Sequence, residues 1–306
     1  MNSRWQLSLN ALGVVLAALL PTGCGRPGAS GEAGLSVAVS ILPAKWMVEQ
    51  LAGARVQVTT LVLPGENPHT YQPSDAQVSR LMRSAVFFRV GAPFENGPWF
   101  QAIQGSGRLR IVDLREGVEL LDMGPHADHP AERGPPGAEQ HEHGGGKDPH
   151  IWLSPRLLKI QAATMARVLA EVDPAHGADY DRNLAAFQRR LDELDASLRA
   201  KLAPLRGKAF FVFHPAWGYF AHDYGLRQVA IEVEGKEPSD RELTEIQRQA
   251  RESGAKVILV QPQISGRAAQ AVAQAAGAKV EGADPLAEDL PAALTRVANV
   301  LAESVK

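Results

Sequence analysis

Hydrophobic and polar positions alternate in short runs along most of the chain, and longer amphipathic stretches separate these runs. Alternation with a period of two predicts strands, while apolar residues at spacings of three and four predict helices. In the first half, strands are predicted at 35–42, 56–62, 85–90 and 109–113, with helices at 44–52, 74–84 and 98–104. Strands that alternate with helices indicate parallel βαβ units.

A second set of the same kind follows after residue 207. Strands are predicted at 209–213, 228–233, 257–260 and 279–281, with helices at 216–224, 239–252, 266–276 and 290–304. Ser239 and Glu242 have the spacing of a capping box, which marks the start of one helix. The fold class predicted is α/β, with two lobes that each contain a parallel sheet flanked by helices.

Two helices without intervening strands connect these sets, at 154–172 and 175–205. Ser154 and Pro155 are typical of a helix start. In the second helix, apolar residues such as Leu184, Phe187 and Leu191 recur at spacings of three or four. They predict one helix of roughly 25–30 residues with a single apolar stripe. We expect it to act as a rigid strut between the lobes.

The first 24 residues have the pattern of a processing signal. Arg4 precedes an apolar stretch that is too short for a standard transmembrane helix, and Cys24 follows small residues. This pattern is similar to a bacterial lipoprotein signal, although Pro21 stands where leucine is usual. A plain signal peptide with an incidental cysteine is the alternative. We expect Cys24 to be acylated and residues 25–34 to form a flexible tether.

The segment 124–147 interrupts the α/β pattern. It contains four histidines and several glycines, prolines and glutamates, and almost no apolar residues, so we expect it to be disordered. The predicted organisation is therefore a leader at 1–24, a tether at 25–34, a first lobe at 35–172, a linker helix at 173–206 and a second lobe at 207–306.

Composition limits the chemistry. Hydrophobic residues make up 45% of the 306 residues and charged residues 22%, which is typical of a globular protein. A formal net charge of −2 argues against nucleic acid as the main partner. One cysteine excludes an internal disulfide framework and a thiolate cluster, so any metal site must use nitrogen and oxygen.

Three histidines stand in ordered contexts: His69 in Asn-Pro-His-Thr-Tyr, His150 in Asp-Pro-His-Ile-Trp and His214 in Phe-His-Pro-Ala-Trp. His69, His214 and Asp284 follow predicted strands, and ligands in parallel sheets bind at the carboxyl ends of strands. Three imidazoles and one carboxylate match a four-coordinate zinc site. Any one of these histidines, taken alone, is more often a surface residue than a ligand.

The chain resembles the metal-specific solute-binding proteins of bacterial ABC importers, the zinc and manganese cluster. The matching stretches run from about Leu35 to the C-terminus and begin at Asn67, Asp148, Phe213, Glu234 and Asp284. The resemblance implies two α/β lobes joined by a long rigid helix, with the metal in the cleft between them. It implies that His69, His150, His214 and Asp284 are the ligands.

The resemblance also implies a function. We expect the protein to capture Zn²⁺ outside the cytoplasmic membrane, in the periplasm or cell envelope, as a monomer without enzymatic activity. It would deliver the ion to a membrane permease and its ATPase. Manganese members of the cluster tend to have a second carboxylate at the position of His214, so the imidazole favours zinc. A manganese or iron importer component is the main alternative.

Two other classes of function remain open. A secreted zinc hydrolase would need an open coordination position and a general base, for which Glu66 is the only plausible candidate. A surface adhesin is less expected, because the chain contains no adhesive repeat.

The histidine-rich segment resembles the insertion of zinc-specific members. His126, His129, His141 and His143, together with Glu132, Glu139 and Glu142, could hold zinc weakly, whereas a plain solvated linker is the alternative. We expect deletion of 124–147 to leave one tight site.

Two further histidines, His176 and His222, are expected to be ordinary surface residues. The aromatic residues near the motifs are expected to pack around the site, namely Trp152, Trp217, Tyr219 and Phe220.

Overall fold

The computed structural model describes residues 34–123, 146–232, 236–264 and 266–304. The predicted leader, nearly all of the predicted tether and residues 124–145 lie outside this range. Cys24 and the four histidines of the histidine-rich segment are therefore not described.

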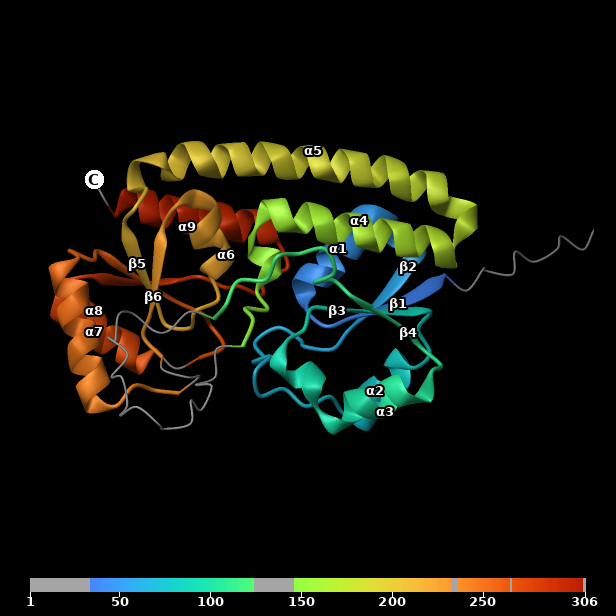
Figure 1. Cartoon of the computed structure of the whole chain (residues 1–306), viewed down its shortest axis with the longest axis horizontal. Coiled ribbons are helices and arrows are strands. Elements are labelled where there is room, and N and C mark those ends of the chain that lie inside the picture. Colours follow the sequence, from blue (N-terminus) through green and yellow to red (C-terminus); the bar gives the residue numbers. More distant parts are fainter. Residues whose placement is uncertain (1–33, 124–145, 233–235, 265, 305–306) are drawn as a thin grey trace, which may run out of the picture. The chain divides into compact units, whose positions relative to one another are not determined.

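The first half builds a parallel four-stranded sheet in the order β2-β1-β3-β4 (Figure 1). Its strands are β1 (Leu35–Val39), β2 (Val56–Thr60), β3 (Val86–Arg89) and β4 (Arg110–Asp113). The helices between them are α1 (Leu42–Ala52), α2 (Asp75–Leu81) and α3 (Pro98–Ser106). The sequence predicted each element, but β1 ends earlier than expected, because Pro43 occupies the first turn of α1, where its fixed φ suits a helix.

The second half repeats this topology with a parallel sheet in the order β6-β5-β7-β8. Its strands are β5 (Ala209–Val212), β6 (Arg227–Ala230), β7 (Val257–Val260) and β8 (Lys279–Gly282). Its helices are α6 (Gly218–Tyr224), α7 (Asp240–Glu252), α8 (Arg267–Ala276) and α9 (Leu290–Glu303). The predicted capping box at the start of α7 is present in the structure, with Ser239 and Glu242 bonded reciprocally.

Two long helices, α4 (Pro155–Val172) and α5 (Gly177–Leu202), follow the first sheet. Figure 1 shows α5 running past both sheets. It packs against α1 and α4 on the side of the first sheet and against α9 on the side of the second. Its 26 residues correspond to about 39 Å of helix. The long helix predicted from the leucine spacing is thus present.

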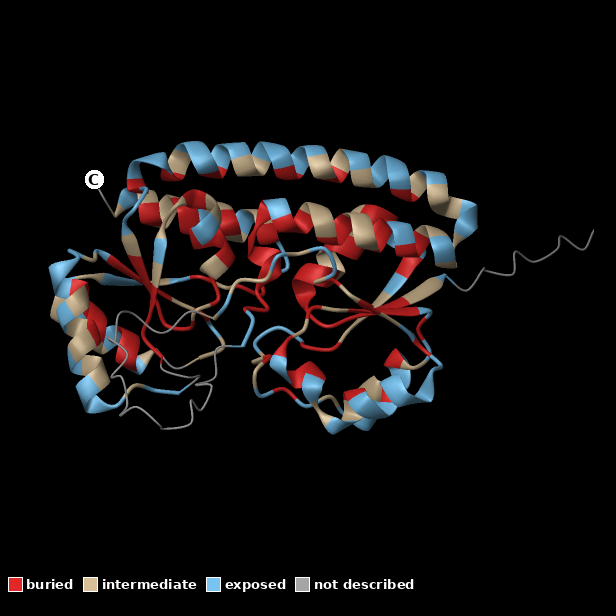
Figure 2. Cartoon of the chain, viewed as in Figure 1, coloured by how far each residue is buried: buried red, intermediate tan, exposed pale blue. Residues whose placement is uncertain are grey.

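Buried residues form a large hydrophobic cluster that is shared by both halves (Figure 2). It includes Val37 and Phe88 from the first sheet, Val212 from the second, and residues of α4, α5 and α9. A smaller cluster fills the space between the other face of the second sheet and α7 and α8. Adjacent residues Phe211 and Val212 belong to different clusters, as expected for a strand buried on both faces. A shared core opposes large independent movements of the two sheets.

Hydrogen bonds also join the two halves near the ends of the strands. The indole Nε1 of Trp152 donates to the carbonyl oxygen of Pro285 over 2.7 Å. The hydroxyl of Tyr219 donates to the carbonyl oxygen of Asp148 over 2.9 Å and accepts from the amide of Leu121 over 3.1 Å. Because Trp152 and Tyr219 are almost fully buried, they pack around this region as the sequence predicted.

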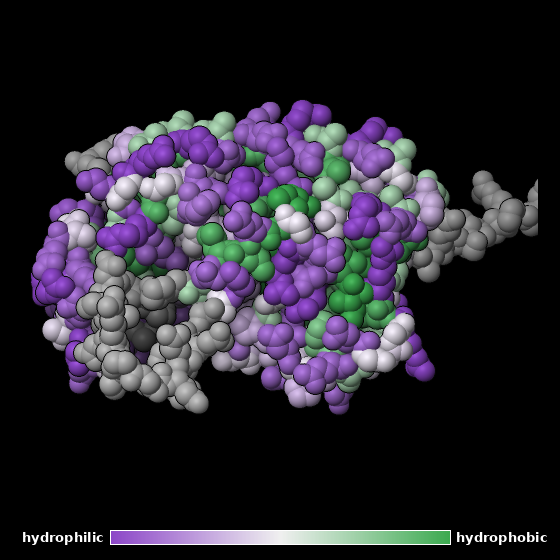
Figure 3. All heavy atoms as spheres, in the orientation of Figure 1, coloured by the Kyte–Doolittle hydropathy of each residue, from purple (hydrophilic) through white to green (hydrophobic). Residues whose placement is uncertain are grey.

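Hydrophilic side chains cover most of the face shown in Figure 3, with smaller hydrophobic patches between them. In the part of the chain that the structure describes, none of the helices combines the length and the hydrophobicity that a membrane crossing requires.

Candidate metal centre

Three loops bring histidines to one place. His69 lies in the loop after β2, where its backbone amide donates to Asn67 Oδ1 over 2.9 Å and holds the turn. His150 immediately precedes the 3-10 helix η3 (Ile151–Leu153), and His214 lies two residues after β5. The carboxyl ends of parallel strands therefore position two of the three histidines, as the sequence analysis expected.

The three imidazoles form a compact cluster. One nitrogen from each of His69, His150 and His214 lies within 4.8 Å of the other two. The Nε2 atoms of His150 and His214 are 3.3 Å apart. The ring of His69 lies 4.4 Å from that of His214 and 6.0 Å from that of His150, centroid to centroid. Side chains that are far apart in the sequence thus converge as predicted.

Two buried carboxylates hold the rings from behind. Asp148 Oδ1 lies 2.7 Å from His150 Nδ1, and Glu232 Oε1 lies 2.6 Å from His214 Nδ1. All four side chains are at most 5% exposed. Carboxylates in this position fix the ring orientation and raise the basicity of the imidazole. Sequence analysis did not identify either carboxylate as a partner.

These carboxylates determine which ring nitrogen carries the proton. A carboxylate only accepts hydrogen bonds, so Nδ1 of His150 and of His214 must be the protonated nitrogen. In the neutral rings both Nε2 atoms then present lone pairs to each other across 3.3 Å. Two nitrogens bound to one tetrahedral zinc at 2.0–2.1 Å lie roughly 3.3–3.4 Å apart. The observed separation therefore suits a shared cation.

Burial favours the neutral form of the imidazoles of His69 and His214. It lowers the pKa of His69 from 6.5 to about 3, with smaller contributions from His214 and His150. Burial also lowers the pKa of His214, although the carboxylate of Glu232 opposes this shift. Neutral imidazole is the form that binds metal.

The fourth predicted ligand, Asp284, is not part of the histidine cluster. Its Oδ1 accepts from Gln263 Nε2 over 2.8 Å and from the backbone amide of Leu286 over 2.9 Å. The cavity beside the histidines is lined by nine residues: Pro68, His69, His150, Trp152, His214, Gln261, Gln263, Pro285 and Leu286. Gln263, rather than Asp284, contributes to this lining.

Other residues singled out from the sequence lie elsewhere. Glu66 Oε2 accepts from the amide of Leu63 over 2.7 Å, so this carboxylate closes its own turn. The side chain of His222 is 60% exposed, and His176 pairs with Asp173 over 2.8 Å, as expected for surface histidines.

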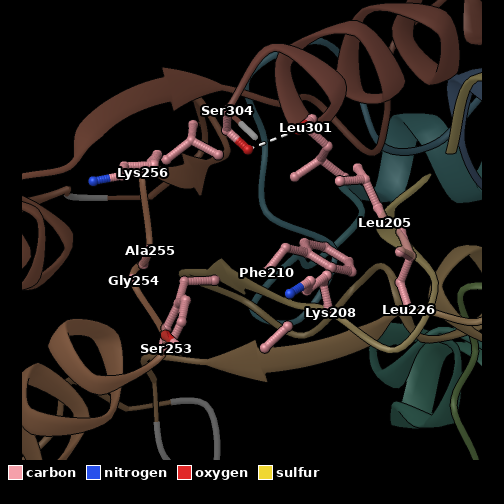
Figure 4. A pocket seen from close by; sticks show the side chains of 13 residues that line it. Leu205, Lys208, Phe210, Leu226, Ser253, Gly254, Ala255, Lys256, Leu301 and Ser304 are labelled. Atoms are coloured by element: carbon pink, nitrogen blue, oxygen red, sulfur yellow. Dashed lines mark hydrogen bonds between the residues drawn. The ribbon is translucent and has the colours of Figure 1, made fainter. Parts of the chain in front are cut away.

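A larger cavity of about 260 Å³ lies at the opposite, amino-terminal end of the second sheet (Figure 4). Leu205, Leu226 and Leu301 form much of its wall, and Lys208 and Lys256 also line it. None of its lining residues is a histidine, a cysteine or a carboxylate. This cavity therefore lacks the donors that a metal site requires.

The chain is similar to several known zinc-uptake proteins. The family model described as "Zinc-uptake complex component A periplasmic" matches residues 37–303. A crystal structure of ZnuA is 36% identical with a TM-score of 0.80, and the match covers 89% of this chain and all of the other. A ZnuA deletion mutant with zinc bound is 37% identical with a TM-score of 0.77, and its match covers 89% and 98%. The high-affinity zinc uptake system protein ZnuA of Bacillus subtilis is 27% identical, with 86% and 83% covered.

Proposed function

Because the chain belongs to the periplasmic zinc-uptake family of ABC-importer solute-binding proteins, we propose that it captures Zn²⁺ outside the cytoplasmic membrane. It then delivers the ion to a membrane permease that is driven by its ATPase. His69, His150 and His214 are the protein ligands that hold the ion. The protein acts as a carrier, and its cycle includes no chemical turnover.

The observation that supports this proposal best is the approach of His150 and His214. Their Nε2 atoms lie 3.3 Å apart, and each Nδ1 is directed to a buried carboxylate. Two facing lone pairs in a buried site repel each other unless a proton or metal ion lies between them. A zinc ion bound by both Nε2 atoms removes this repulsion, and the imidazole of His69 binds the same ion.

The donor set favours zinc over manganese. Imidazole nitrogen suits zinc, whereas carboxylates and water suit manganese. The carboxylates of Asp148 and Glu232, which lie beside the cluster, already face Nδ1 atoms of histidines. Zinc also binds more tightly than manganese or iron(II) at a given nitrogen site. Copper would bind more tightly still, so metal availability contributes to selection.

A hydrolase is a weaker proposal for this site. A hydrolytic zinc site needs a general base next to a metal-bound water. Glu66, the candidate base from the sequence, accepts the amide of Leu63. The carboxylates that do face the cluster accept from the histidines, which suits ligand orientation rather than proton transfer.

Two accessory features complete the proposal and lie outside the described residues. Acylation of Cys24 would anchor the protein to a membrane, with residues 25–34 as a tether. His126, His129, His141 and His143 would collect zinc weakly and pass it to the tight site. Deletion of 124–147 should then lower the total zinc bound without removing the tight site.

Competitive metal titration of the metal-free protein tests the proposed function. A chromophoric chelator would report zinc and manganese binding in separate experiments. We expect one tight zinc site per chain and a far lower affinity for manganese. Substitution of His69, His150 or His214 by alanine should weaken zinc binding markedly in each case. Manganese bound as tightly as zinc would favour a manganese importer component instead.

A further inference from the structure

Each strand of the second sheet is followed, within three residues, by a polar side chain. Glu232 follows β6, His214 follows β5, Gln263 follows β7 and Asp284 follows β8. Because the strands are parallel and lie in the order β6-β5-β7-β8, these four residues follow the same edge of the sheet in that order. Glu232 bonds to His214, and Asp284 bonds to Gln263, so the edge carries two matched pairs.

The second pair fixes the orientation of an amide. Asp284 Oδ1 lies 2.8 Å from Gln263 Nε2. An ionised carboxylate only accepts hydrogen bonds, so the amide nitrogen must face Asp284 and the carbonyl oxygen must face away from it. The same Asp284 oxygen accepts the amide of Leu286, which holds the carboxylate in place.

The carbonyl oxygen of Gln263 is buried and accepts no hydrogen bond from the described residues. Buried side-chain oxygens usually have a partner, so one without a partner indicates a missing ligand or ion. Thr60 Oγ1 and Gln161 Oε1 are also unpartnered, but neither residue lines the histidine cavity, whereas Gln263 does. That cavity has a volume of about 10 Å³, which is about the space of one water molecule or small ion.

We propose that Gln263 Oε1 is the fourth, neutral donor to the ion held by His69, His150 and His214, and that Asp284 is a positioning residue. This proposal rests on the proposed function, because it assigns a further ligand to the same site. Gln263 takes the place in the ligand set that the sequence motif suggested for Asp284. Asp284 orients the donor oxygen of Gln263 by accepting from its amide nitrogen. Glu232 orients the donor Nε2 of His214 in the same way, by accepting from its Nδ1.

A neutral fourth donor changes how the site behaves. A carboxylate ligand would attract the ion more strongly and would raise the relative affinity for manganese. The amide oxygen of Gln263 instead serves as the fourth donor atom, so that all four protein ligands of the ion are neutral. It can also withdraw without leaving an unpaired buried charge, which suits a protein that must release its cargo.

Three substitutions test this assignment by competitive zinc titration. Gln263→Met removes the oxygen at similar volume, and we expect the zinc affinity to fall roughly tenfold or more. Asp284→Asn keeps an oxygen that accepts from Gln263, so we expect a smaller loss. Gln247→Met alters a glutamine of α7 that does not line the cavity, and it should leave the zinc affinity close to that of the wild type.

Thermal unfolding separates ligation from a structural role. The Gln263→Met protein should unfold at the wild-type temperature without metal, but zinc should raise this temperature by less than in the wild type. In cobalt-substituted protein, the visible absorption of the bound ion should change with Gln263→Met and stay unchanged with Gln247→Met. A larger loss of affinity with Asp284→Asn than with Gln263→Met would overturn the proposal, as would equal losses with Gln247→Met and Gln263→Met.

The wild-type titration keeps the two proposals distinguishable. If the wild-type protein bound no zinc tightly, the proposed function itself would fail. If it bound zinc tightly and Gln263→Met bound it equally well, only the assignment of Gln263 would fail.

Discussion

Gly218 lies directly against the carboxylate of Asp148. A Cβ atom at position 218 would be 2.5 Å from Asp148 Oδ2, closer than real Cβ contacts come. Asp148 bonds through its other oxygen to both the backbone amide and the Nδ1 of His150. The first residue of α6, in one half of the molecule, thus limits where the carboxylate behind a histidine of the other half can lie.

Gly218→Ala should therefore weaken zinc binding, although position 218 contributes no ligand. The added methyl group displaces Asp148, and His150 loses its fixed orientation. Losses of this kind are about 10- to 100-fold in metal affinity. Competitive zinc titration measures the effect. Gly105→Ala in α3 is the matched control, because a Cβ there meets no atom within 4 Å. The idea fails if both variants bind zinc like the wild type.

Glu232→Gln tests the carboxylate behind His214. Glutamine can still accept from Nδ1, but it lacks the charge that raises the basicity of the imidazole. We expect zinc affinity to drop by roughly tenfold to 100-fold. Glu66→Gln provides the control, because Glu66 closes a turn near His69 and faces the amide of Leu63. Similar losses in the two variants would show that the charge of Glu232 has no special role.

The metal-free protein should lose stability as the pH falls from about 6.5 towards 3. Burial lowers the pKa of His69 from 6.5 to about 3, so the unfolded chain binds a proton that the folded chain excludes in this interval. The contribution of His69 is complete above pH 6.5 and declines as the pH falls. Denaturant unfolding at pH 7, 5 and 4 would compare the wild type with His69→Gln. The wild type should show the steeper decline, and equal slopes would contradict the depressed pKa.

Local sequence patterns predicted the secondary structure because most elements here follow simple rules. Strands buried on one or both faces show apolar runs, and the leucine spacing of α5 marks a helix of 26 residues. The end of β1 was predicted too late, because two local patterns overlap there. Leu42 continues the apolar run of the strand, but Pro43 favours the first turn of a helix, so Leu42 is the first residue of α1.

The candidate site was predictable only in part. His69, His150 and His214 stand in recognisable motifs at loop positions, and the structure brings them together. Glu232 was missed, because only the pairing of β5 with β6 brings it to His214, 18 residues away. The amide of Gln263 was missed for a similar reason, since its orientation depends on the neighbouring strand β8 and on Asp284.

Zinc K-edge X-ray absorption of the 1:1 zinc complex tests the central claim most directly, namely that imidazoles from both halves bind one ion. The 1:1 complex of a variant lacking 124–147 is the appropriate sample, since it contains none of the histidines of that segment. The account predicts scattering from three imidazoles with nitrogens at about 2.0–2.1 Å. Scattering from two imidazoles or fewer would contradict it.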